Sequence, residues 1–364
     1  CVPTISSISP PAGQLCLASE QENAIVTTFR QDLESIALFG QLTWNISDAW
    51  GATLGLRWTT DEKDGDFDDR VNNPISAQFH AAETTLGMKR DDSKAPGLAN
   101  VTWKVTEDVM LFASFSTGYK SGGYNSSGGA EALGEERRIF APEESTNYEL
   151  GVKSRLLDGS MTANATLYRT DLDNFQDRGF DGLSFVVINA GKLRHQGIEA
   201  DINWLPIEPL SLVAGVSYLD SEYLSFEGAP PLPAGAAQDL TGERRNYSPE
   251  WQTSLAADWT QGFADGLEWF VGASWSWVDE QNVGASSDNN PQSMQDSFSF
   301  INARVGLRSA RRNWDITLFG NNLTDEDYCQ AIFQQAIGGL LGAVNPVNNT
   351  SVQRCVLGAP RTWR

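Results

Sequence analysis

Long stretches of this chain alternate apolar and polar residues one by one, and this alternation constrains the fold more than any other feature. Between Ser35 and Ile46 the even positions are mostly apolar, with Leu38, Leu42 and Trp44 among them, and polar residues lie between them. A period of two residues is that of a β-strand with one apolar face, whereas helical spacing would mix the two sets. The alternation therefore predicts strands.

The same period recurs along almost the whole chain, which predicts about twelve long strands and the start of another. These segments are 35–46, 50–59, 100–105, 109–116, 147–155, 161–167, 198–204, 210–218, 251–260, 269–277, 301–308 and 314–318, followed by 361–364. No Pro-, Gly- or Ser-rich linker separates two different textures, so the 364 residues are interpreted as one β structure.

The connections between these strands alternate in length. Short connections lie near Ser47, Thr106, Leu157, Pro206, Gly262 and Ala310, and long ones cover roughly 61–95, 120–144, 171–188, 224–248, 280–296 and 325–360. Tight turns on one side and long loops on the other are typical of a transmembrane β-barrel. Tryptophans such as Trp44, Trp103 and Trp204 sit on the apolar faces beside the short turns, as an interfacial girdle requires.

The polar strand faces carry charges that a dry core would have to desolvate at a large cost. Arg57, Lys153, Arg155 and Arg304 are the cations that we single out on these faces. They predict a wide polar lumen, and they favour an anionic ligand unless carboxylates in the lumen pair with them.

Composition excludes several classes of function. The chain has 47 Asp and Glu against 26 Lys and Arg, a net charge of -21, so nucleic-acid binding by a basic surface is excluded. We find no G-x-S-x-G and no H-E-x-x-H, and therefore predict no catalytic residue and no cofactor. His80 is expected in a loop, and His195 is expected to make a structural hydrogen bond.

The cysteines form two local pairs, Cys1 with Cys16 and Cys329 with Cys355, in segments rich in turn residues. Neither pair has zinc-ligand spacing, so we predict two loop disulfides in an oxidising compartment. The acidic runs 61–69 and 171–177 do not match a calcium-binding EF-hand loop, and solvated loop charge is their preferred interpretation.

A loop rich in Gly and Ser, residues 118–129, carries Tyr119, Lys120, Tyr124 and Asn125. It lacks the phosphate-binding pattern G-x-x-x-x-G-K-[ST], so nucleotide binding is rejected. Two interpretations stay open: an extracellular loop whose aromatic residues close over a ligand, or a loop top that touches only solvent or a neighbouring loop.

Five segments resemble the β-barrel of TonB-dependent outer-membrane receptors. They are LFASFSTGYKSGGYN (111–125), STNYELGVKSRLLDGSMTANATLYRTDLDNF (145–175), NAGKLRHQGIEADINWLP (189–206), LFGNNLTDEDY (318–328) and GAPRTWR (358–364). The resemblance implies an all-β, antiparallel, 22-stranded barrel in the bacterial outer membrane, of which this chain would be about the last thirteen strands.

On this interpretation residues 1–34 are an extracellular loop and strand entry, 35–328 hold twelve strands, 329–360 form the last extracellular loop and 361–364 start the final strand. The resemblance also implies partners: a plug domain, the inner-membrane TonB complex, outer-membrane lipid and lipopolysaccharide. The expected activity is energised uptake of a scarce ligand such as a ferric siderophore. Alternatives are a passive porin, a receptor for a carbohydrate or cobalamin, and an outer-membrane hydrolase or adhesin-like barrel.

Overall fold

A computed structural model describes residues 25–72, 82–127, 138–180, 184–233, 235–264, 266–311, 313–334, 344–345, 347 and 349–364. They form one 14-stranded antiparallel sheet in which neighbours along the chain are neighbours in space, with β3 (Glu83–Lys94) paired to β2 off the main path. The main path runs through β1 (Ile25–Asn45), β2 (Trp50–Val71), β4 (Gly97–Lys104), β5 (Val109–Lys120), β8 (Glu143–Leu156), β9 (Met161–Phe180), β10 (Phe185–Ile207), β11 (Leu210–Ser225), β14 (Trp251–Ala264), β15 (Leu267–Val278), β18 (Phe298–Ser309), β19 (Asp315–Asn321) and β22 (Thr362–Trp363). Each of the twelve predicted strands, and the thirteenth, corresponds to one strand of this path.

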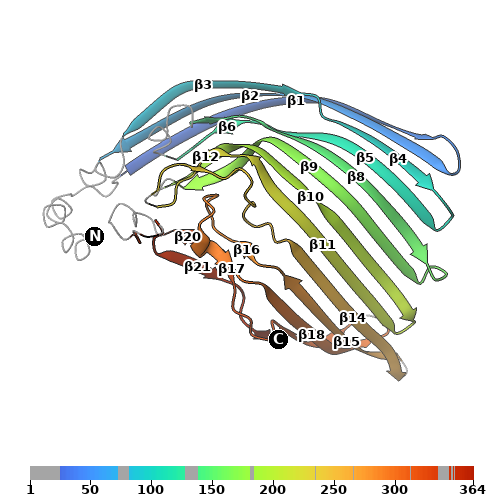
Figure 1. Cartoon of the computed structure of the whole chain (residues 1–364). Helices are drawn as coiled ribbons and strands as arrows, with labels where there is room; N and C mark the ends of the chain where they lie inside the picture. Colours follow the sequence, from blue (N-terminus) through green and yellow to red (C-terminus); the bar gives the residue numbers. More distant parts are fainter. Residues whose placement is uncertain are drawn as a thin grey trace.

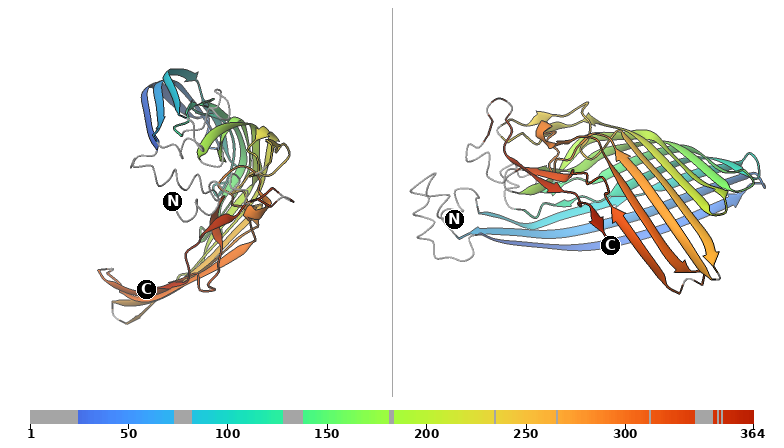
Figure 2. Two further views of the ribbon diagram at one scale, coloured as in Figure 1. Left: turned by 90° about the vertical axis from the view of Figure 1, so that its left-hand side faces the viewer. Right: turned by 90° about the horizontal axis from the view of Figure 1, so that it is seen from below.

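The sheet bends into an open arc (Figures 1 and 2). All short turns lie at one end of the strands, and the long connections lie at the other end. These connections carry the short strands, which lie on the hollow side of the arc: β6 (Gly123–Tyr124), β7 (Ile139–Phe140), β12 (Glu227–Ala229), β13 (Gln238–Asp239), β16 (Gln281–Asn282), β17 (Met294–Gln295), β20 (Cys329–Gln334) and β21 (Gln353–Leu357). In the described part of the chain no helix is long and apolar enough to span a membrane.

The prediction that 61–95 and 171–188 are loops is wrong for most of their length. β2, β9 and β10 have 22, 20 and 23 residues, about twice the 9–11 residues that a tilted strand needs to cross a bilayer. Both acidic runs therefore lie on strands. The excess length projects beyond the apolar band at the long-connection end, where both faces of a strand can be polar and the alternation that reveals a strand disappears.

β3 and β4 are one strand interrupted by a proline. Thr59 of β2 pairs with Lys94 of β3, and Leu56 of β2 pairs with Gly97 of β4, so the register continues across the break. Pro96 has no N–H to donate to the ladder, but its carbonyl oxygen accepts a 2.9 Å hydrogen bond from the backbone N–H of Arg57.

The first strand begins at Ile25, before the predicted start at Ser35. Its pairing with β2 runs without a break from Ile25 opposite Val71 to Asn45 opposite Gly51. The early part lies opposite the acidic half of β2, and its own polar residues hide the period. The boundary between 34 and 35 therefore has no counterpart in the structure.

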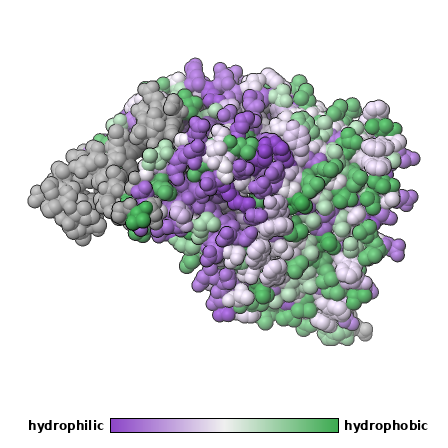
Figure 3. All heavy atoms as spheres, viewed as in Figure 1, coloured by the Kyte–Doolittle hydropathy of each residue, from purple (hydrophilic) through white to green (hydrophobic). Residues whose placement is uncertain are grey.

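The halves of the strands near the short turns expose large apolar side chains on one face. Leu38, Leu42 and Ile316 are 75%, 67% and 70% exposed, and the indole rings of Trp50 and Trp103 stack with centroids 5.2 Å apart. Figure 3 shows hydrophobic residues gathered toward this end and hydrophilic residues toward the long connections. The apolar band is therefore the surface that lipid covers.

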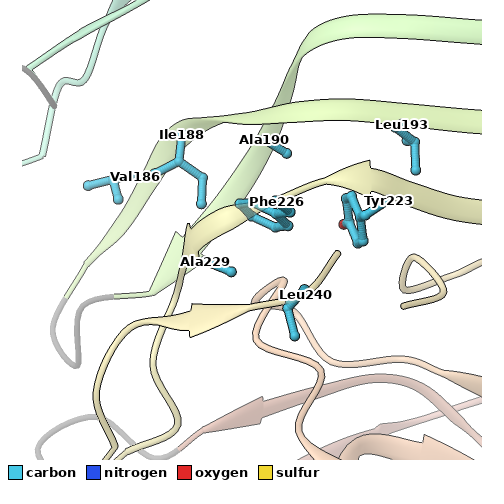
Figure 4. Packing of buried hydrophobic residues seen from close by; sticks show 8 residues of the cluster. All are labelled: Val186, Ile188, Ala190, Leu193, Tyr223, Phe226, Ala229 and Leu240. Atoms are coloured by element: carbon cyan, nitrogen blue, oxygen red, sulfur yellow. The ribbon is translucent and has the colours of Figure 1, made fainter. Parts of the chain in front are cut away.

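The buried core lies at the other end, between the wall and its connections. The larger cluster joins Val186, Ile188, Ala190 and Leu193 of β10 to Tyr223, Phe226, Ala229 and Leu240 of β11 and the chain that follows it (Figure 4). A smaller cluster contains Phe67, Met88 and Tyr124. The long connections are thus packed onto the wall.

Candidate functional site

The hollow side of the wall at the long-connection end is the candidate site, and a local irregularity shapes it. Leu172 and Phe175 of β9 both pack against the larger buried cluster, although three residues apart they should face opposite ways. Asn174 between them has φ 52°, in the left-handed region that Asn tolerates. This residue reverses the alternation, so Asp177 also faces the cluster.

A hydrogen-bonded group, which we call the β9–β11 polar group, lies beside this cluster. The hydroxyl of Tyr223 donates to Asp177 Oδ2 at 2.5 Å, and both side chains are buried. Arg245, from the β11–β14 connection, places its Nε 3.8 Å from the same oxygen and its guanidinium 5.0 Å from the centre of the Phe175 ring. We include in this group His195 and Ser221, which lie opposite each other on β10 and β11, although His195 Nδ1 and Ser221 Oγ have no hydrogen-bond partner among the described residues.

The β15–β18 connection, residues 279–297, is the centre of a second group, which we call the loop knot. The Asn246 side-chain amide donates to the carbonyl oxygens of Gly284 and Ser286 at 3.0 and 2.8 Å, and the Tyr247 hydroxyl donates to Val283 O at 2.7 Å. The N–H of Ala285 donates to Ile332 O at 2.9 Å. The connections before β14, β18 and β22 are therefore joined by buried hydrogen bonds.

Asp288 is the acidic member of the loop knot. Its side chain accepts hydrogen bonds from Gln334 Nε2 and from the backbone N–H of Asn290. Burial raises the pKa of this carboxyl to about 6, because removing it from water disfavours its charged form more than these bonds favour it.

The third group covers the upper part of β2. Arg138 and Glu83 form an ion pair in which both side chains are almost fully buried, at 2% and 3% exposed. The Arg138 guanidinium also lies 3.7 Å over the centre of the Phe67 ring and donates to the carbonyl oxygen of Ser127 at 2.9 Å. A buried charge with this set of partners holds the β5–β8 connection against the wall.

The predicted ligand-loop residues are placed at this third group. Tyr119 donates its hydroxyl to Asp61 Oδ2 at 2.8 Å, and buried Tyr124 donates to the Lys63 carbonyl oxygen at 2.8 Å. Asn125 is clamped to β10, since its amide donates to Val187 O at 2.9 Å and its Oδ1 accepts from Val187 N at 2.7 Å. Lys120 ends β5 and is exposed. Their contact with a ligand stays a prediction.

The four predicted lumen cations are all exposed on the polar strand faces. Arg304 pairs with Asp258 at 2.7 Å, and Arg155 pairs with Asp108 in the β4–β5 turn at 2.9 Å. Lys153 lies 5.7 Å from the centre of the Phe112 ring. No such contact of the Arg57 side chain is seen among the described residues. Carboxylates of the wall itself thus neutralise part of the predicted positive charge.

A hollow of about 460 Å³ lies on the polar face around Asp258 and Arg304, with Asn302, Thr317 and Phe319 among its lining residues. A second hollow of about 300 Å³ shares Asp258, Arg304 and Thr317 and extends to Arg308. Among the described residues no three His, Cys, Asp or Glu side chains are grouped to hold a metal ion. This surface can bind polar groups.

The predicted pairing of Cys329 with Cys355 is confirmed by a disulfide with Cα atoms 5.4 Å apart, which links β20 to β21. Cys1, Cys16 and His80 lie outside the described residues. The hydrogen bond predicted for His195 stays a prediction; its Nδ1 is buried and has no hydrogen-bond partner among the described residues. Sequence reasoning missed Arg138, Asp177, Tyr223 and Arg245, since nothing local distinguishes them from solvated loop residues.

Comparison with known proteins places this wall in a family. The profile described as TonB dependent receptor-like, beta-barrel, matches residues 4–323. The probable TonB-dependent siderophore receptor PiuA of Acinetobacter baumannii is 25% identical over 234 residues, covering 64% of this chain and 30% of PiuA. The ferric-pyoverdine M114 receptor PbuA of Pseudomonas sp. is 26% identical over 272 residues, covering 73% of this chain and 30% of PbuA.

Among solved structures, the ferric yersiniabactin uptake receptor FyuA of Yersinia pestis superimposes with a TM-score of 0.73 at 19% identity, covering 93% of this chain and 46% of FyuA. At that identity the superposition shows the fold alone. This chain spans 30% of the two curated relatives named above and just under half of FyuA. The match over most of its length shows that the chain belongs to the TonB-dependent receptor β-barrel family and lies in the bacterial outer membrane.

Proposed function

We propose that this chain is the C-terminal part of the barrel of a receptor that takes up a scarce metal chelate, most simply a ferric siderophore, with energy supplied from the inner membrane. The observation that carries the proposal is the locking of the long connections onto the hollow side of the wall by buried hydrogen bonds and packing. A fixed polar vestibule above a membrane span suits capture of a rare ligand better than free diffusion. Relatives named for siderophore uptake support the ligand class.

The remaining strands of the barrel, the plug domain and the inner-membrane complex are also proposals. Among the described residues, β1 pairs only with β2 and β22 pairs only with β19, so closure of the barrel requires further strands at both edges. We propose a plug domain in the enclosed space, with the inner-membrane TonB complex acting on it. Lipid covers the apolar band, and lipopolysaccharide faces the charged residues above it, including the Arg194–Asp171 pair at 2.6 Å.

Uptake by the full-length receptor tests the function. A deletion strain complemented with the complete gene is supplied with radiolabelled ferric chelates, with and without a protonophore. The proposal expects saturable uptake that the protonophore abolishes. Uptake that rises linearly with concentration and ignores the protonophore would identify a passive porin. Energised uptake of a carbohydrate or cobalamin instead would keep the receptor and replace the ligand.

A further inference from the structure

Seven buried side-chain polar atoms lack a hydrogen-bond partner in the described chain, and three of them belong to the β9–β11 polar group. These are His195 Nδ1, Ser221 Oγ and Arg245 Nε. Burying a polar atom without a partner is unfavourable, and most buried polar atoms in proteins are therefore paired. Three such atoms in one group point to a missing partner.

The three atoms come from two paired strands and the connection that follows them. His195 of β10 and Ser221 of β11 are direct partners in the strand register. Tyr223 follows two residues after Ser221 and so shares its face, and it binds the Asp177 oxygen that lies 3.8 Å from Arg245 Nε. Arg245 is also near enough to His195 for its charge to act on the imidazole ring.

All three atoms can act as hydrogen-bond donors. The Ser221 hydroxyl and the Arg245 guanidinium N–H donate, and neutral His195 donates when its tautomer carries the proton on Nδ1. The Asp177 carboxylate, 3.8 Å from Arg245 Nε, already receives the Tyr223 hydroxyl and the backbone N–H of Arg178 at 2.9 Å. A single acceptor that serves all three donors needs more than one oxygen.

The exposure of Arg245 and its positive charge are compatible with an oxygen-bearing anion as the partner. The Ser221 residue is 1% exposed, whereas the Arg245 side chain is 28% exposed, so the guanidinium is the part of the group that is open to solvent. Planar guanidinium groups bind carboxylates and phosphates well. We propose that His195, Ser221 and Arg245 bind one oxyanion group, a carboxylate or a phosphate.

Two sources supply this chemistry. The group is either a free inorganic anion or a carboxylate of the transported chelate, and the second source rests on the function proposed above. Replacing Ser221 with Ala distinguishes a binding role from a structural role, because the Ser221 hydroxyl makes no hydrogen bond within the described chain. The variant should fold at least as well as the wild type and lose one donor to the anion.

Calorimetric titration of the full-length receptor in detergent tests the site, with sodium phosphate and sodium citrate as probes and sodium chloride at equal ionic strength as the reference. The expected result is binding of at least one probe that Ser221→Ala weakens about tenfold or more, as loss of a hydrogen bond to a charged group does. Ser217→Ala, four residues earlier on the same face of β11, is the matched control and should bind like the wild type. Absence of binding by the wild type, or equal affinity in Ser221→Ala, would overturn the proposal.

The pH profile of binding gives a readout that a structural role would not change. Arg245 of the following connection is the charged group that acts on His195 among the described residues, and Asp177 of β9 and Tyr223 of β11 adjoin Arg245 in the same group. A bound anion favours imidazolium, so affinity for phosphate should rise as the pH falls from 7.5 to 5.5, and this rise should vanish in His195→Gln. An unchanged profile in that variant would remove His195 from the site.

Uptake assays assign the source and keep the two proposals distinguishable. If Ser221→Ala weakens both phosphate binding and chelate uptake, the oxyanion belongs to the chelate. If it weakens phosphate binding alone, the site takes a free anion. Phosphate binding that depends on Ser221, in a receptor without energised uptake, would sustain the site and refute the proposed function. Energised uptake by a receptor whose phosphate binding does not depend on Ser221 would refute only the anion site.

Discussion

The two ends of the same strands remove their apolar side chains from water in different ways. Near the short turns Leu38 and Leu42 are 75% and 67% exposed, whereas near the long connections Phe67, Leu193 and Tyr223 are at most 2% exposed. The first end relies on lipid to cover its apolar face, and its chain makes a single layer. The second end lies above the apolar band and therefore covers its own apolar surface with its connections.

The difference also concerns charge. The lumen pair of Arg304 and Asp258 keeps both side chains about half exposed, while Arg138 and Glu83 are almost fully buried. Exposed pairs add little to stability, but a buried charge depends strongly on its partner. We therefore expect mutations to act through lipid at one end and through buried polar contacts at the other.

The largest effect is expected from Arg138→Met, which leaves the Glu83 carboxylate buried without its cation. Amide exchange in β3 of the full-length receptor should report a loss of about 3–5 kcal/mol in local stability. Lys89→Met breaks an exposed pair with Asp64, at 3.8 Å, and should cost below about 1 kcal/mol. Similar losses in the two variants would mean that burial does not decide the value of these pairs.

The next effect belongs to the apolar band. Leu255→Arg on β14 places a charge against lipid and should lower the free energy of unfolding in vesicles by about 2–4 kcal/mol. Ser254→Arg, the adjacent residue on the opposite face, should be close to neutral because it meets water. The assignment of faces fails if urea titration ranks Ser254→Arg as the more damaging change.

Tyr223→Phe removes the hydroxyl that donates to buried Asp177 and should destabilise the β9–β11 polar group by about 1.5–3 kcal/mol, a value for hydrogen bonds to charged groups. Amide exchange in β9 and β11 measures the loss. Tyr218→Phe on the same strand, whose ring packs 4.8 Å from Trp251, is the control and should change little. An unaffected Tyr223→Phe variant would show that Asp177 does not need this donor.

The smallest effect is a pH dependence. Burial, with a contribution from Arg245, lowers the pKa of His195 from 6.5 to about 4. Below pH 6.5 the imidazole is therefore protonated in the unfolded chain and still neutral in the folded chain, so acid destabilises the fold. This costs about 1 kcal/mol at pH 5.5 relative to pH 7.5. Comparing the unfolding midpoints of wild type and His195→Gln at both pH values isolates it from Asp288, whose raised pKa acts in the opposite direction. An equal acid loss in both proteins would locate the titration elsewhere.

Sequence patterns predicted the strands well where one face meets lipid. Leu54, Leu255 and Ile316 alternate with polar neighbours, because lipid and water on opposite faces impose a period of two. The alternation is lost beyond the apolar band, so β3 and the acidic half of β2 were predicted to be a loop. At Asn174 the backbone reverses the alternation, which no count of apolar residues reveals.

The site was predicted only in part. Tyr124 and Asn125 were found as unusual residues of a Gly- and Ser-rich loop, but the structure engages both in packing the β5–β8 connection onto the wall. Arg138 and Glu83 are 55 positions apart, and Tyr223 and Asp177 are 46 apart. Each of these residues looks like an ordinary solvated side chain until its partner is known.

The sequence by itself determined that this chain is a membrane wall of antiparallel strands with short turns at one end, and it paired Cys329 with Cys355. These properties follow from contacts between segments close in the sequence or from the medium on each face, and both leave a pattern in the sequence. Only the tertiary structure decided how far the strands rise above the membrane and which polar groups meet beneath the connections. That outcome depends on packing between distant segments, where burial changes the meaning of a charge and leaves no local pattern.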